Sequence, residues 1–178
     1  MRKGTCKEYL FILTNLICSF LLGFLLIDKM NIGFEPYSFV FDADENFFVT
    51  FFSILANNTF FCLFLMFGIG VITMPLIWWQ GFQLGAMFSV WISSDNSTLD
   101  YFMLLLPHGV IEFSSLIIFS VIGLQMFRLV KNCYHGEKVN FGKWLLLKKR
   151  SIIIGIILIF VAAIVECTLT PYIFNLMR

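Results

Sequence analysis

The sequence feature that most constrains the fold is a run of roughly 46 residues, from Phe47 to Ile92, that contains no acidic or basic side chain. About 20 apolar residues cross the roughly 30 Å hydrocarbon core of a bilayer, so this run is about twice as long as one crossing needs. We therefore predict two membrane spans joined by a tight turn. The polar group from Gln80 to Gln83 could supply the break, but we favour the region of Pro75, because proline frees backbone groups and interrupts helices.

The composition extends this conclusion to the whole chain. The 178 residues are 60% hydrophobic and 13% charged, and the mean hydropathy is +0.90. These values lie outside the range of soluble globular domains. No internal repeat and no Pro-rich or Gly/Ser-rich linker divides the chain. We predict a single all-α membrane domain over residues 1–178, a polytopic bundle of about five transmembrane helices. The predicted spans are 9–27, 50–73, 75–92, 107–130 and 151–170.

The basic residues predict the orientation of these spans. A cytoplasmic N-terminus places ten of the 12 lysines and arginines on the inner side and leaves only Lys29 and Arg178 outside. Such an asymmetry is the positive-inside pattern of membrane proteins. We therefore predict a multi-pass protein of the bacterial cell membrane with its N-terminus in the cytoplasm. The ten inner residues are Arg2, Lys3, Lys7, Arg128, Lys131, Lys138, Lys143, Lys148, Lys149 and Arg150.

The longest predicted inner segment, residues 128–150, combines several basic side chains with Trp144 and the leucines that follow it. This make-up is typical of a helix that lies along an anionic inner leaflet. Flanking charge that only sets the topology is an equally good interpretation. The five cysteines form no C-x-x-C pair, and we interpret them as structural.

Two glutamates lie well inside predicted spans, where a charged side chain costs about 2.5 to 3.5 kcal/mol at the bilayer centre. Glu112 lies about 7 Å from the outer end of its span and Glu166 about 6 Å from the outer end of its own, at 1.5 Å per residue. Asn57 and Asn58 fall close to the same level, and His108 lies one helical turn from Glu112 on the same face. We predict that these five side chains form one polar layer.

Three interpretations of this layer remain open, and Gln83 or Ser89 of the third span could extend it. The first is a hydrogen-bond network that holds helices together. The second is a binding site for a substrate or a proton in an outward-facing cavity. The third is a metal centre or intramembrane hydrolase, which the sequence disfavours because His135, the second of two histidines, lies on the cytoplasmic side. We expect no metal, no cofactor and no catalytic residue.

Small residues and one proline predict where helices approach each other closely. Gly81-x-x-x-Gly85 and Gly68-x-Gly70 have the spacings that let helices pack in lipid. Gly109 would let another backbone come near. Pro107 suits the first turn of a helix, because the N–H that proline lacks has no partner there.

Four segments have together the order and spacing of one membrane-protein family. They are LANNTFFCLFLMFGIG (55–70), QGFQLG (80–85), LLPHGVIEFSSLIIFSVIGL (105–124) and VECTLTP (165–171). With these segments the chain resembles the stage II sporulation protein M family from about residue 47 onward, and the P-H-G-x-x-E element and the late glutamate before Thr-Pro are the specific parts. The residues that the resemblance points to are Asn57, Gly81, Gly85, Pro107, His108, Gly109, Glu112, Glu166 and Pro171. Where the family commonly has Asn-Gly, this chain has Gln80-Gly81.

The resemblance implies an integral membrane subunit that works with partners and has no established catalytic activity. Sporulation members of the family help to assemble the septal peptidoglycan-degrading machinery for engulfment. Small relatives occur in gene sets for circular bacteriocins, where they are associated with peptide production, export and self-protection. The predicted outer loop from Asp28 to Asn46 offers little surface for recruiting extracellular enzymes, which favours the second role.

We therefore expect a non-catalytic accessory or transporter-like subunit for a circular bacteriocin, with immunity as part of the same function. The alternative is a membrane scaffold of the sporulation engulfment complex. The chain contains no nucleotide-binding motif, so ATP-driven export would need a separate ATPase. The expected partners are other membrane proteins of the same system, a hydrophobic peptide and the lipid bilayer, but no nucleic acid.

Overall fold

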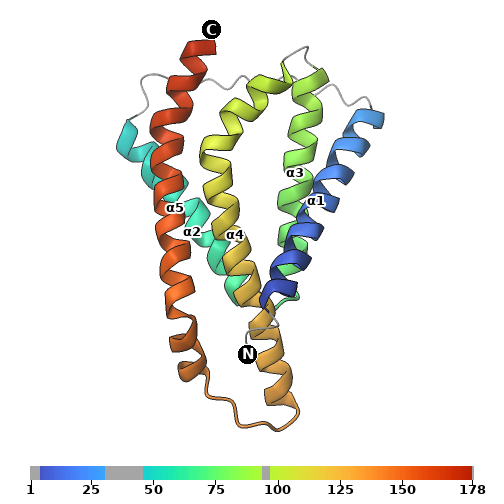
Figure 1. Ribbon diagram of the computed structural model, residues 1–178, viewed down its shortest axis with the longest axis vertical. Helices are drawn as coiled ribbons and strands as arrows, with labels where there is room; N and C mark the ends of the chain where they lie inside the picture. Colours follow the sequence, from blue (N-terminus) through green and yellow to red (C-terminus); the bar gives the residue numbers. More distant parts are fainter. Residues whose placement is uncertain (1–4, 31–45, 94–96, 178) are drawn as a thin grey trace.

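The computed structural model describes residues 5–30, 46–93 and 97–177. These residues form five helices and no strand: α1 (Thr5–Met30), α2 (Phe47–Phe67), α3 (Thr73–Ser93), α4 (Thr98–Tyr134) and α5 (Phe141–Met177). Successive helices run in opposite directions, so the 68–72 turn and the 135–140 loop lie toward one end of the bundle (Figure 1). We call this the lower end, as it is drawn. The predicted all-α bundle is confirmed, and most of the predicted outer loop lies outside the described residues.

Four of the helices are long and apolar enough to cross a membrane. They are α1, α2, α4 and α5. Helix α3 has 21 residues, as α2 does, but it is less apolar because it contains Trp78, Trp79, Gln80 and Gln83. Helix α3 therefore depends more on protein neighbours than the other helices do.

Polar residues directly before three of the helices explain where these helices begin. The side chain of Asn46 accepts a hydrogen bond from the Phe48 amide, and that of Ser97 accepts one from the Leu99 amide. Asn140 does the same for the amide of Lys143 at 2.9 Å. Each cap satisfies one of the amides that have no partner in the first turn of a helix.

The break between α2 and α3 lies at residues 68–72, several residues before the predicted break near Pro75. Ile69 has φ 49° and Gly70 has φ 70°, a left-handed backbone that glycine adopts at little cost. The Thr73 hydroxyl donates to the Leu65 carbonyl at 2.8 Å and so ties the two helix ends together. Gly68 and Gly70 therefore lie in the turn and not within two packed helices, although Gly70 still lies close to α4, where an added Cβ would be 3.1 Å from the Cβ atom of Phe127. Pro75 lies in the first turn of α3, where it breaks no helical hydrogen bond.

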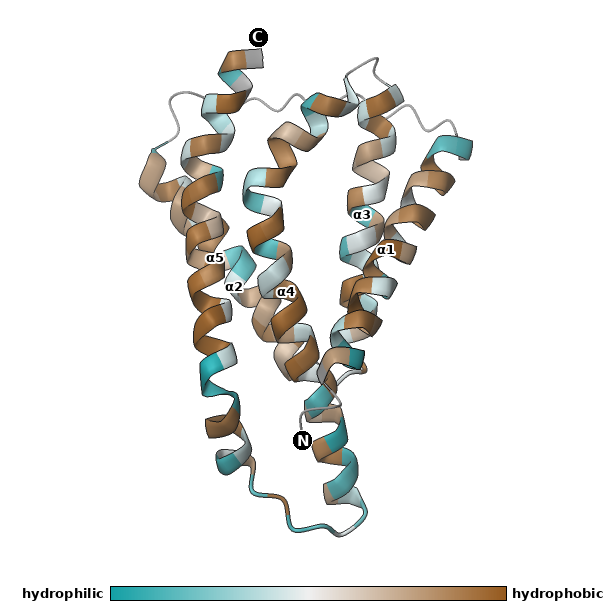
Figure 2. Cartoon of the chain, viewed as in Figure 1, coloured by the Kyte–Doolittle hydropathy of each residue, from teal (hydrophilic) through white to brown (hydrophobic). Residues whose placement is uncertain are grey.

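Helices α4 and α5 are both longer than the predicted spans. Helix α4 begins at Thr98, so Pro107 lies inside it and not in its first turn, which corrects that prediction. An internal proline removes a backbone hydrogen bond, and α4 bends in its first half (Figure 1). Residues 141–150 form the start of α5 in one continuous helix. The separate surface helix considered for residues 128–150 is therefore not present, and hydrophilic residues gather where α4 ends and α5 begins (Figure 2).

The helices form two units that meet in the lower half of the bundle. Helix α1 packs along α3, and α4 packs along α5 with α2 against both. A Cβ added to Gly85 would lie 1.9 Å from the Phe20 carbonyl oxygen, and one added to Gly81 would lie 2.0 Å from the Ser19 hydroxyl. These glycines therefore let α3 contact the backbone of α1. Gly109 has more room, because its nearest contacts would be side-chain atoms at 3.3 Å or more.

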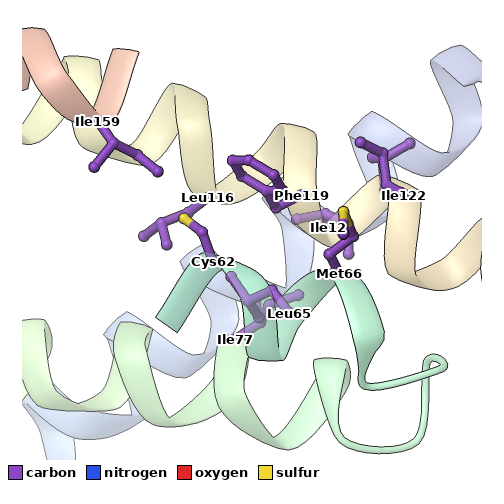
Figure 3. Close-up of a cluster of buried hydrophobic side chains, with 10 residues drawn as sticks. Ile12, Cys62, Leu65, Met66, Ile77, Leu116, Phe119, Ile122 and Ile159 are labelled. Atoms are coloured by element: carbon purple, nitrogen blue, oxygen red, sulfur yellow. The ribbon is translucent and has the colours of Figure 1, made fainter. Parts of the chain in front are cut away.

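The two units share one hydrophobic core (Figure 3). Its fully buried members include Ile12 of α1, Leu65 of α2 and Phe119 of α4. A Cβ added to Gly123 of α4 would lie 2.1 Å from the Leu65 carbonyl oxygen, so α2 and α4 also approach closely here. The core holds the lower half together and leaves the polar residues of α4 and α5 above it.

Candidate functional site: a polar cluster between three helices

The candidate site lies where the upper half of α4 faces α5. The Thr170 hydroxyl and the Nδ1 atom of His108 form a hydrogen bond of 3.2 Å. Glu112 follows His108 by four residues in α4, and Glu166 precedes Thr170 by four residues in the antiparallel α5. The two carboxylates are close enough for their charges to interact. All of these side chains except the buried Thr170 are half-buried. The structure therefore brings together the histidine and both glutamates of the predicted polar layer.

Below the carboxylates, a serine joins α4 to both of its neighbours. The buried Ser115 hydroxyl donates to the Gly155 carbonyl of α5 at 3.1 Å. The Cys62 thiol of α2 lies 3.7 Å from the same hydroxyl and within electrostatic range of Glu112. Ser115 follows Glu112 by three residues, which keeps both on one face of α4. Three helices thus contribute polar groups to one region.

The two asparagines of α2 lie differently. Asn58 is half-buried and precedes Cys62 by one helical turn, so it shares the face that points toward the site. Asn57 is exposed on the surface of the described chain. Asn57 therefore lies outside the predicted layer, because adjacent helical residues point about 100° apart. Gln83 is also exposed, and α3 does not contact α5.

We define the polar cluster as the seven residues that the three helices α2, α4 and α5 place together. Its members are Asn58, Cys62, His108, Glu112, Ser115, Glu166 and Thr170. Neither glutamate forms a hydrogen bond or an ion pair with another side chain of residues 5–30, 46–93 and 97–177. The described part of the chain also has no group of three histidine, cysteine, aspartate or glutamate side chains that could hold a metal ion. The cluster therefore presents two carboxylates that the described chain leaves available to a proton or to a hydrogen-bond donor.

One charged residue inside the bundle was missed by the sequence analysis. Glu8 of α1 is 4% exposed and forms an ion pair with Arg128 of α4. Its second oxygen accepts a hydrogen bond of 2.6 Å from the amide of Gln125. Glu8 directly precedes the first predicted span and follows Lys7, which made it resemble flanking charge. The signal that was available is its sign, because it is an acidic residue in an otherwise basic inner segment.

The five-helix fold and its buried polar groups define an α-helical membrane protein with a polar cluster inside the bundle. The chain belongs to the stage II sporulation protein M family, whose family model matches residues 11–171. The resemblance seen from about residue 47 onward is thereby confirmed, and the match also includes α1. No curated protein and no solved structure matches the chain.

Proposed function

We propose that the protein is a non-catalytic accessory or transporter-like subunit in the production, secretion and self-immunity of a circular bacteriocin. It spans the bacterial cell membrane several times and works with other membrane proteins, among them a separate ATPase. Its substrate is the hydrophobic bacteriocin peptide, and the polar cluster is the part of the protein that takes part in transporting it. The proposal rests on the family, on the short segment between α1 and α2, and on the carboxylates of the cluster.

The observation that carries a transport role is the pair Glu112 and Glu166. Ionisable residues inside membranes are expensive and most often lie along substrate or proton pathways. A glutamate that only held helices together would be expected to bond to a neighbouring helix, as Glu8 does with Gln125. Glu112 and Glu166 make no such bond within the described chain. A proton, or a polar group of a passing peptide, is the partner that we assign to them.

The residues around the carboxylates support a binding role in place of a catalytic one. The hydroxyl of Ser115 already donates to the backbone of α5, so it is held as a structural group. The Nδ1 atom of His108 bonds to Thr170, and within the described residues His108 bonds to no serine or cysteine. The cluster can therefore bind and release protons and can accept hydrogen bonds, without forming a covalent intermediate.

The distribution of basic residues supports a cytoplasmic lower end. The lower parts of α4 and α5 carry Arg128, Lys131 and Lys143, on the same end as the start of α1. Cys133 is exposed there and provides a test. In a variant whose other cysteines are replaced by alanine, a membrane-impermeant maleimide should label Cys133 only after the cells are permeabilised. Labelling of Cys133 in intact cells would show that the lower end faces outward.

The experiment that tests the function uses a bacteriocin-producing host. Deletion of the gene should abolish peptide release or leave the producer sensitive to its own peptide. Complementation with Glu112→Gln or Glu166→Gln should restore less than about a tenth of the release, with the protein still present in the membrane. Glu137→Gln, an exposed glutamate of the 135–140 loop, is the matched control and should restore release fully. Unchanged release and immunity after deletion would contradict the proposal.

Membership of the family favours a second function, a scaffold of the sporulation engulfment complex. The two functions differ in their neighbouring genes and in their phenotype. A precursor of a small circular peptide and an ATPase gene nearby favour the first function. A sporulating host in which deletion stops engulfment, with the septal hydrolases no longer localised, favours the second. In that case the two glutamine variants should retain function, because a scaffold does not need titratable groups.

A further inference from the structure

One side of the lower part of α5 carries an open groove between basic and aliphatic side chains. The groove has a volume of about 370 Å³. Its lining positions recur at spacings of three and four residues, so they lie on one side of the helix. The lining residues are Leu146, Leu147, Lys149, Arg150, Ile153 and Ile154.

This side of α5 faces away from the rest of the bundle. Lys148 is half-buried and Gly155 is buried, and a Cβ added to Gly155 would lie 2.6 Å from the Phe119 ring of α4. Leu146 and Leu147, which point the other way, are 71% and 66% exposed. Helix α5 is long and apolar enough to cross a membrane, so lipid covers its outer side.

The groove lies at the level of the lipid headgroups. Trp144 and Tyr172 are 28 residues apart on α5. At 1.5 Å per residue this is about 42 Å, which matches the roughly 40 to 45 Å of a bilayer with both headgroup regions included. Tryptophan and tyrosine are enriched at the two membrane interfaces. The groove begins two residues after Trp144, and Ile153 and Ile154 lie further into the hydrocarbon.

The direction of the side chains gives the groove a charged end and an aliphatic end. Side chains of a helix lean toward its N-terminus, which for α5 is the lower end. Lys149 and Arg150 therefore extend downward over Leu146 and Leu147, so their aliphatic parts cover the leucines and their charges reach the headgroup level. Hydrophilic residues form a band on α5 between two hydrophobic stretches (Figure 2). A phospholipid has the same order of groups, with a phosphate above which the acyl chains enter the hydrocarbon.

The positive charge of the groove is not neutralised by the described chain. The sequence contains no acidic residue between Glu137 and Glu166. Within residues 5–30, 46–93 and 97–177 neither Lys149 nor Arg150 forms an ion pair, whereas Arg128 of α4 is paired with Glu8. An arginine beside a lysine is well suited to bind phosphate, because its guanidinium can donate two parallel hydrogen bonds. Basic clusters at the end of a membrane span attract anionic lipids.

We propose that this groove binds one anionic phospholipid of the lower leaflet, with the phosphate at Lys149 and Arg150 and an acyl chain along Ile153 and Ile154. A zwitterionic phospholipid has the same phosphate, but its own positive charge would be repelled by the two basic side chains. Glu166 of the polar cluster lies 16 residues above Arg150, about 24 Å along α5. The lipid site is therefore separate from the cluster, and it depends neither on the transport role nor on which way the protein faces.

The test is lipid binding to the full-length protein, measured by native mass spectrometry. The first molecule of phosphatidylglycerol should bind about thirtyfold more tightly than phosphatidylcholine. At about 1.4 kcal/mol per tenfold this preference corresponds to about 1 kcal/mol for each of the two basic residues. The double variant Lys149→Gln with Arg150→Gln should lose the preference. Lys131→Gln with Lys138→Gln removes the same charge from exposed positions at the same end and should keep it.

Three results of this titration would overturn the proposal. The first is a wild-type protein that binds the two lipids equally. The second is an equal loss of the preference in both double variants, which would show that the lipid is attracted by the total charge of the lower end. The third is displacement of the lipid by millimolar glycerol 3-phosphate, which would indicate a site for small anions that needs no acyl chain.

Fluorescence quenching locates the bound lipid on the helix. A single tryptophan is introduced as Ile154→Trp into a chain whose four native tryptophans are replaced by phenylalanine. Brominated phosphatidylglycerol in phosphatidylcholine membranes should quench it more strongly than brominated phosphatidylcholine does in phosphatidylglycerol membranes, at equal brominated fractions. Ile164→Trp, at an exposed position ten residues further up α5, is the control and should be quenched equally by both. Equal quenching at position 154 would also overturn the proposal.

Discussion

Glu8 of α1 and Arg128 of α4 form an ion pair at the lower end of the bundle, with Glu8 almost fully buried and Arg128 largely exposed. This ion pair and the bond from Gln125 connect the α1–α3 unit to the α2–α4–α5 unit. The same buried carboxylate therefore accepts a hydrogen bond from Gln125 and forms an ion pair with Arg128, both on α4. Loss of this carboxylate should weaken the contact between the two units.

Replacement of Arg128 by glutamine should lower the stability of the protein by roughly 1 to 2 kcal/mol. The buried Glu8 carboxylate would keep only one partner, although solvent around the exposed arginine moderates the effect. Thermal unfolding in detergent, followed by the loss of helical signal, measures the change. Lys131→Gln, an exposed neighbour on the same helix, is the control and should be neutral. The double variant Glu8→Gln with Arg128→Gln should be more stable than Arg128→Gln alone, and the absence of such coupling would contradict the ion pair.

Replacement of Gly85 by alanine should lower the stability by at least about 2 kcal/mol, because α1 and α3 would have to move apart. The added Cβ would lie 1.9 Å from the Phe20 carbonyl oxygen. Gly142→Ala is the matched control, since its Cβ would meet only a side-chain oxygen at 3.6 Å. Unfolding in a denaturing detergent series compares the two. Equal stability of both variants would show that α1 and α3 are not in backbone contact.

Replacement of Ser115 by alanine should cost about 0.6 to 2 kcal/mol, the range for an interhelical hydrogen bond in a membrane. The variant loses the bond to the Gly155 carbonyl of α5. Its neighbour Ser114 is exposed and bonds only to the Val110 carbonyl of its own helix, so Ser114→Ala should change the stability by less than about 0.5 kcal/mol. Equilibrium unfolding of the two variants is the measurement. If Ser114→Ala lowered the stability more than Ser115→Ala, the side of α4 that packs against α5 would not be the one that carries Ser115.

Replacement of Thr73 by valine should destabilise the α2–α3 turn by about 1 to 3 kcal/mol, because the Leu65 carbonyl would remain buried without its hydroxyl donor. Thr14→Val is the control, since Thr14 is exposed and bonds within its own helix. Amide hydrogen exchange around residues 64–74 should rise in the first variant alone. Unchanged exchange there would show that the hydroxyl does not stabilise the turn.

The helical membrane character of this protein could be read directly from its sequence. A run without charge from Phe47 to Ile92 cannot remain in water, and inside a bilayer every backbone group must bond within its own helix. The number and order of the helices follow from the lengths of such runs. The predicted positions of the helix ends were less accurate. The 68–72 turn depends on a left-handed backbone at Ile69 and Gly70, and the lengths of apolar runs do not predict backbone conformation.

The candidate site was partly predictable for a physical reason. Polar residues are so costly in hydrocarbon that His108, Glu112 and Glu166 stand out in the sequence by themselves, and counting residues from the span ends placed the glutamates at one depth. The direction in which a side chain points depends on how the helices rotate against each other. Only the tertiary structure therefore decided that Asn58 turns inward and Asn57 outward, and that Glu8 is buried beside Arg128. Depth is determined along one chain, whereas burial requires knowing which helix lies opposite.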